Sequence, residues 1–142
     1  MTLTTKIIDY SGLNGNRRYD YDALCKAVND YNKSGNKLVH SKDDRIGYDS
    51  KFAKSPERVH FSDAVGIVSE DIQNDDKNKW LIATIELLNN PKGQIVEKLF
   101  KEGHCPHFSP NILGEYKFIE DDDGNKIKVF KPSAIVGIDF DR

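Results

Sequence analysis

Signal sequences, long apolar runs and cysteine are absent or scarce in this 142-residue sequence. Residues 1–6 contain no basic segment followed by an apolar one, so we expect no signal peptide and synthesis in a cytoplasm. The two cysteines are then expected to be reduced thiols. The longest apolar runs, such as residues 80–83, are too short to span a bilayer. These absences predict a water-soluble chain that folds without disulfides.

The sequence also lacks a large excess of either positive or negative charge. The chain has 21 basic and 23 acidic residues, a net charge of −2, and no like-charge block longer than residues 121–123. This balance favours neither a nucleic acid nor a membrane partner, and a protein surface or peptide is the expected one. A content of 37% hydrophobic and 10% aromatic residues argues against disorder. We expect residues 1–142 to form a single domain.

The apolar periodicity predicts two helices. Asp20 is placed to cap the first, and Gly35 is placed to end it in a left-handed conformation. Pro91 suits the first turn of the second, which Gly103 should end. The expected buried positions of the two helices are Leu24, Ala27, Val28 and Tyr31 in the first and Ile95, Val96, Leu99 and Phe100 in the second.

The remaining apolar segments predict strands, which makes the fold α+β with a mainly antiparallel sheet or barrel and two helices. Residues 59–68 and 80–88 should form an antiparallel pair, and residues 116–119 and 127–130 should flank a turn. Further strands are expected over residues 6–10, 37–40 and 134–140, and a polar loop over 41–57. We expect Trp80 and Ile82 to share one core with the two helices.

The stretch HCPHFSPNILGEY, residues 104–116, collects several chemically active side chains. His104, Cys105 and His107 are too few for a structural zinc site, since the only other cysteine is Cys25. Cys105 lacks the glycine-rich turn of a nucleophile signature. The acidic residues 121–123 lack the ligand spacing of a calcium loop and predict a solvated turn. We expect no metal and no cofactor.

A serine hydrolase needs a hydroxyl, a base and a group that orients the base, and these can come from distant parts of a chain. Ser109 follows the second predicted helix, His40 ends a predicted strand, and Asp139 lies in the last one. Serines and aspartates are common, so composition leaves this trio one option among many. His60, Asp63 and Asp141 are alternatives for the third member.

A family resemblance adds weight to the trio. The stretch NGNRRYDYDALCKAVNDYN, residues 14–32, resembles a signature of the tailed-phage prohead proteases. The stretch NKLVHS resembles the family's histidine strand and keeps His40, and WLIATIELLNNPKGQIVEKLFKEG resembles its strand, turn and helix. In SPNILG, Ser109 matches the first serine and Gly114 the closing glycine of the family motif, and SAIVGIDFD matches its last catalytic strand with Asp139. The matching positions of the first stretch are Arg17, Tyr19, Leu24, Lys26, Ala27, Val28 and Tyr31.

The resemblance implies a herpesvirus-assemblin-like fold and a serine endopeptidase of capsid maturation. Ser109, His40 and Asp139 would be catalytic, and Asn111 and Gly114 would bind the oxyanion or the substrate. The implied partners are phage scaffold and major capsid proteins, with a homo-oligomer left open. The implied location is the host cytoplasm, within the prohead or virion.

The sequence also departs from the family at its motifs, which keeps other functions open. Pro110 and Asn111 stand where the family has Ser-Arg, and Ser41 stands where it has proline. Proline donates no amide hydrogen and asparagine has no guanidinium. The alternatives are a catalytically inactive protease-fold protein with a structural role in the phage head, and an unrelated binding module.

Overall fold

A single curled sheet with two helices makes up the described part of the chain. The computed structural model describes residues 1–13, 15–41, 64–104 and 107–141. No helix within these ranges is long and apolar enough to cross a membrane. The elements in chain order are β1 (Thr2–Asp9), α1 (Tyr21–Ser34), β2 (Leu38–Ser41), β3 (Gly66–Val68), β4 (Gln73–Asp75), β5 (Trp80–Leu87), α3 (Pro91–Lys101), β6 (His107–Glu120) and β7 (Lys126–Asp141).

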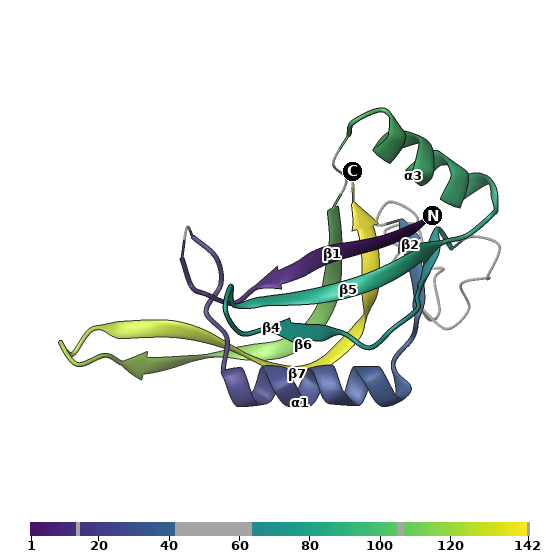
Figure 1. The fold of residues 1–142 in the computed structure, drawn as a ribbon. Helices are drawn as coiled ribbons and strands as arrows, with labels where there is room; N and C mark the ends of the chain where they lie inside the picture. Colours follow the sequence, from purple (N-terminus) through teal and green to yellow (C-terminus); the bar gives the residue numbers. More distant parts are fainter. Residues whose placement is uncertain (14, 42–63, 105–106, 142) are drawn as a thin grey trace, which may run out of the picture.

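The strand order is β1-β5-β3-β2-β7-β6, and β4 pairs with β5. All pairings are antiparallel except the one between β2 and β7, which is parallel. The sheet curls into a half-barrel, so that its two end strands, β1 and β6, approach each other (Figure 1). The expected α+β class with a mainly antiparallel sheet is confirmed.

Helix α1 begins at the predicted cap, but its end differs from the prediction. The Asp20 carboxylate accepts a hydrogen bond from the Ala23 amide at 3.1 Å, as an N-cap residue should. The predicted left-handed Gly35 is wrong, because its φ is −72°. A Cβ at Gly35 would collide with the ring and carbonyl oxygen of Tyr31, so close approach excludes a side chain there. The buried face of α1 packs on β7 (Figure 1).

Helix α3 covers one end of the sheet through a narrow stripe. The Asn90 side chain accepts a hydrogen bond from the Gly93 amide at 2.7 Å, and Pro91 occupies the first turn. Val96 is buried, and Leu99 and Phe100 are partly buried against the core. The prediction that Ile95 is buried is wrong, because it is 52% exposed. Neighbouring helical residues point roughly 100° apart, so Ile95 falls outside a stripe centred on Val96.

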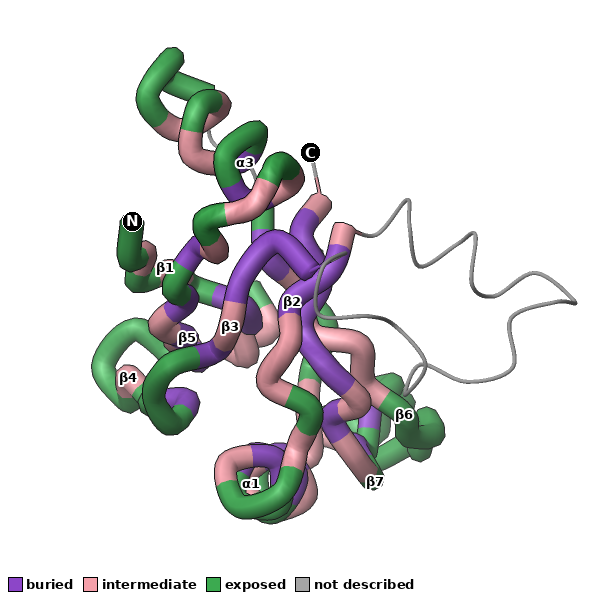
Figure 2. The backbone as a smooth tube through the Cα atoms, turned by 90° about the vertical axis from the view of Figure 1, so that its right-hand side faces the viewer, coloured by how far each residue is buried: buried purple, intermediate pink, exposed green. Residues whose placement is uncertain are grey.

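The core lies on one face of β5, and Figure 2 shows burial concentrated in β2, β3 and the C-terminal part of β7. Leu81, Ala83 and Ile85 point into this core. Trp80 and Ile82 are only half-buried, contrary to the prediction, because successive residues of a strand face opposite sides. Strand alternation therefore separates them from Leu24 and Val28 of α1, which are buried as predicted.

The C-terminal quarter of the chain is one long bent hairpin. The turn predicted over residues 121–123 is confirmed, and its Asp121 carboxylate accepts hydrogen bonds from the amides of Asp123 and Asn125. The strands predicted over residues 127–130 and 134–140 are both part of β7. Irregular register at residues 111–114 of β6 lets the hairpin bend opposite Pro132. The tip of this hairpin extends beyond the rest of the sheet (Figure 1).

Truncation of a buried and of an exposed side chain should show which helical residues belong to the core. We expect Leu24→Ala to lower the free energy of unfolding by about 2–5 kcal/mol, because Leu24 is 1% exposed and its removal leaves a cavity. The exposed Ile95→Ala variant is the control and should change it by less than about 0.5 kcal/mol. Urea unfolding followed by circular dichroism measures both. Equal losses in the two variants would contradict this assignment of the core.

Candidate functional site

Three neighbouring strands align the predicted trio in one row. Ser109 of β6 lies directly opposite Asp139 of β7, and His40 of β2 lies beside Asp139 on its other side. Residues paired across neighbouring strands point to the same face of a sheet. The structure therefore brings Ser109, Asp139 and His40 together, with Asp139 in the middle.

The row lies on the opposite face from the apolar core of these strands. Phe108 and Phe140 form the next pair along β6 and β7, and Ile138 pairs with Val39 of β2. All four are buried members of the core cluster. Because a strand alternates its faces, one side of these strands is apolar and the other carries the polar row.

Burial gives the row an unusual environment for ionisable groups. His40 is 6% exposed, Asp139 is 8% exposed, and the Nε2 atom of His40 is itself buried. Both residues interact with their surroundings. Charged groups are seldom buried without such interactions, because desolvation of a charge is costly. Ser109 is half-buried and thus the most accessible member of the row.

Ser109 also lines a pocket of about 470 Å³ between the two end strands of the curled sheet. One wall comes from β1 through Ile7, Ile8 and Asp9, and the other from residues 109–112 of β6. Asn16, Arg17 and Tyr19 of the segment between β1 and α1 complete it. Both Ser109 and Asn111 are thus within reach of a ligand that enters between β1 and β6.

The two residues expected to bind the oxyanion or the substrate have different surroundings. Asn111 lies two residues after Ser109, opposite Gly137, and so shares its face and its pocket. Gly114 lies at the second irregular step of β6 and is absent from the lining of that pocket. A Cβ at Gly114 would lie against the Lys131 carbonyl oxygen and the Phe130 ring. Close approach of β6 and β7 is therefore a structural reason for this glycine.

Arg17 is a site residue that the trio alone does not reveal. Its guanidinium lies 4.4 Å from the centre of the Phe130 ring and 5.8 Å from that of Tyr19. The two rings hold a fixed positive charge in the pocket that contains Ser109. The signal available in the sequence was the shared presence of Arg17 and Tyr19 in the family signature.

The other candidate residues are less well placed or lie outside the described residues. His104 and His107 are exposed, and His107 pairs with Asp141 one step along the same face as Asp139. Asp141 therefore remains an alternative third member. Cys105, His60 and Asp63 lie outside the described residues.

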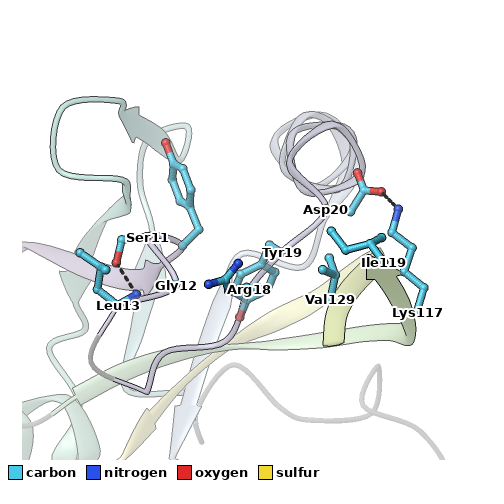
Figure 3. A pocket seen from close by; sticks show the side chains of 10 residues that line it. Ser11, Gly12, Leu13, Arg18, Tyr19, Asp20, Lys117, Ile119 and Val129 are labelled. Carbon is cyan, nitrogen blue, oxygen red and sulfur yellow. Dashed lines mark hydrogen bonds and ion pairs between the residues drawn. The ribbon is translucent and has the colours of Figure 1, made fainter. Parts of the chain in front are cut away.

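A second pocket, of about 390 Å³, lies where the segment after β1 meets the hairpin (Figure 3). There Asp20, the N-cap of α1, accepts a hydrogen bond from the Lys117 ammonium group of β6. This bond, helped by the Ala23 amide, lowers the pKa of the Asp20 carboxyl. The pair ties the start of α1 to the hairpin.

Comparisons with known proteins identify the fold. No family model matches the chain, and no curated protein matches it in sequence. Its structure is similar to that of a phage prohead protease, over 97% of this chain and 80% of the other, with a TM-score of 0.59 and 19% identity. That protein is the bacteriophage T4 capsid assembly protease, gp21. The likeness shows a phage prohead protease-like fold, whereas the expected likeness to herpesvirus assemblin stays a prediction.

Replacing Gly114 should test whether the bend of the hairpin needs a glycine. We expect Gly114→Ala to lower the unfolding free energy by about 1–3 kcal/mol, because its Cβ would meet backbone atoms of β7. Leu113→Ala, at a neighbouring position that is 57% exposed, is the control and should change stability little. Thermal unfolding compares the two. A Gly114→Ala variant as stable as the wild type would refute the close-approach explanation.

Low pH should remove the contribution of the Asp20–Lys117 pair to the free energy of unfolding. Because the pKa of Asp20 is lowered in the folded state, its stabilisation is present above the unfolded value of about 3.9 and is lost as pH falls through the folded value. We expect Asp20→Asn, which keeps a capping side chain, to be less stable than wild type at neutral pH, and the difference to shrink in acid. Urea unfolding at a series of pH values measures this. A difference independent of pH would contradict it.

Proposed function

We propose that this chain is a capsid-maturation serine endopeptidase that cleaves scaffold and capsid precursors inside a phage prohead. One observation carries the proposal: the strand register aligns Ser109, Asp139 and His40 across β6, β7 and β2. The pocket between β1 and β6 supports it, because it gives a polypeptide access to Ser109. The fold shared with a capsid assembly protease agrees with this proposal.

The proposed chemistry assigns one role to each member of the row. The Ser109 hydroxyl attacks the scissile carbonyl, and its proton passes to His40. His40 then returns the proton to the leaving amine, which departs as the acyl-enzyme forms. Asp139 orients the imidazole and stabilises its protonated form. The side-chain amide of Asn111, which lines the same pocket, is the proposed donor to the oxyanion, with Gly114 assigned to substrate binding along β6.

The proposed setting follows from this activity. Residues 1–142 would act as one prohead-protease-like domain with phage scaffold and major capsid proteins as partners. The enzyme would work within the prohead, in the host cytoplasm, and a homo-oligomer is compatible with this role. The chemistry needs no cofactor, because the residues of the row supply the nucleophile, the base and the orienting group.

A second function is an inactive protease-fold component of the phage head. Pro110 has no amide hydrogen to give to an oxyanion, and Asn111 replaces the arginine of the family motif. The register also puts Asp139, rather than His40, in the middle of the row. The backbones of Ser109 and His40 are therefore separated by two interstrand spacings of roughly 4.8 Å each. Direct proton transfer requires their side chains to bridge this distance. These features favour the inactive protein. Absence of cleavage would support the same function.

Removal of the Ser109 hydroxyl separates the two functions. We expect Ser109→Ala to abolish cleavage of co-expressed scaffold or capsid protein while leaving the fold intact, because it removes the nucleophile and little packing. Ser133→Ala, at an exposed serine of β7, is the control and should cleave as wild type does. Electrophoresis of the head proteins measures the cleavage.

Labelling by a serine-directed phosphonate gives an independent readout. Wild-type protein should be labelled at Ser109, and both Ser109→Ala and His40→Ala should not. Absence of both cleavage and labelling in concentrated wild-type protein assembled with capsid would exclude the enzyme and leave the structural role.

A further inference from the structure

A pocket of about 500 Å³ between the segment after β1 and the hairpin is markedly basic. Four of its lining residues are cations: Arg17, Arg18, Lys126 and Lys128. No carboxylate is among the described residues that line it, which also include Gly15, Asn16, Tyr116 and Ile127. We call this the basic pocket. Four positive charges around one small volume create a strong local potential for an anion.

The basic pocket is held by backbone and ring contacts. The Phe130 amide donates to the Arg18 carbonyl at 2.8 Å, and the Asp20 amide donates to the Phe130 carbonyl at 2.8 Å. These two bonds fasten the segment before α1 to β7. The Lys128 ammonium lies 4.0 Å from the centre of the Tyr116 ring, and the Arg17 guanidinium lies 5.6 Å from it. The ring positions both cations without cancelling their charge, since cation–π attraction leaves the net charge unchanged.

The basic pocket shares the lining residues Asn16 and Arg17 with the pocket of Ser109. Strand β6 runs from Ser109 in one to Tyr116 in the other. At about 3.3 Å per residue, the strand between these two residues spans at most roughly 23 Å. An extended polypeptide of about seven residues covers the same length. A chain bound at Ser109 can therefore reach the basic pocket.

We propose that the basic pocket binds the carboxylates of an acidic segment of the polypeptide substrate, about seven residues from the bond presented to Ser109. This proposal rests on the proposed endopeptidase function. Arginine guanidinium groups match carboxylates in two parallel hydrogen bonds, and lysines add point charges. The pocket thus selects among polypeptides by charge at a distance from the reacting atoms.

A short acidic peptide fits this pocket better than a nucleic acid does. Carboxylates of the hairpin border it: Glu120 lies directly opposite Lys126, next to the acidic turn at residues 121–123, and Glu115 lies opposite Lys131. A long polyanion that continued beyond the four cations would meet these like charges, and the chain as a whole has a net charge of −2. A short peptide with a few carboxylates can bind to the four cations without approaching these acidic residues.

Direct binding tests the proposal without cleavage. The Ser109→Ala chain is titrated into a fluorescently labelled glutamate-rich peptide, an identical glutamine-for-glutamate peptide, and a single-stranded DNA of equal charge. Anisotropy is read at low and at physiological ionic strength. We expect the glutamate-rich peptide to bind most tightly, and salt to weaken it, because the contacts are ionic.

Two pairs of substitutions locate the site. In the Ser109→Ala background, Lys126→Gln with Lys128→Gln should weaken binding of the glutamate-rich peptide about tenfold or more, or ~1.4 kcal/mol. Lys33→Gln with Lys77→Gln removes the same charge from exposed positions of α1 and of the β4–β5 turn, and should change binding less than about twofold. Unfolding curves verify that both variants are folded.

Equal binding by the two double variants, or tighter binding of the DNA than of the glutamate-rich peptide, would overturn the proposal. Failure of the endopeptidase function gives a different result, since wild-type protein would then cleave nothing while the glutamate-rich peptide still bound at the lysine pair.

Discussion

Strand β7 is the element on which the rest of the structure depends. It pairs in parallel with β2 and antiparallel with β6, and α1 packs against it. Because side chains alternate along a strand, the burial of Ile138 and Phe140 on one face dictates that Asp139 points to the other. A slip of one residue would exchange the polar row with the apolar core. The hydrophobic effect thus sets the geometry of the candidate site through register, and the polar residues need no strong attraction of their own to be aligned.

Local signals made parts of the fold predictable. The Asp20 cap, the Pro91 start of α3 and the turn at residues 121–123 depend on neighbours in sequence, and all were predicted. The errors arose where tertiary contacts decide. Gly35 is required by the nearby Tyr31 ring rather than by its own φ. Ile95 lies outside the stripe through which α3 meets the sheet, and the polar strand β4 exists because it pairs with β5. No periodicity within the segments themselves carries this information.

The candidate site was predictable only through the order of motifs. Ser109, His40 and Asp139 belong to three separate strands, so spacing along the chain says nothing of their register. The resemblance supplied the trio, and the pairing of β2, β7 and β6 is what brings it together. The basic pocket had no comparable signal, because it forms where the segment after β1 crosses the hairpin. The net charge of the whole chain, which gave no indication of a nucleic-acid partner, also gives no indication of a local cluster of cations.

The parallel pair of β2 and β7 has a consequence for the time at which the site forms. Asp139 follows His40 by 99 residues (139 − 40), so their alignment closes a long loop and is among the less local contacts of the fold. On a ribosome, His40 and Ser109 emerge well before the residue that lies between them in space. A nascent chain therefore carries separate pieces of the row and no assembled row. Synthesis itself delays the completed arrangement until β7 has been made and has paired on both sides.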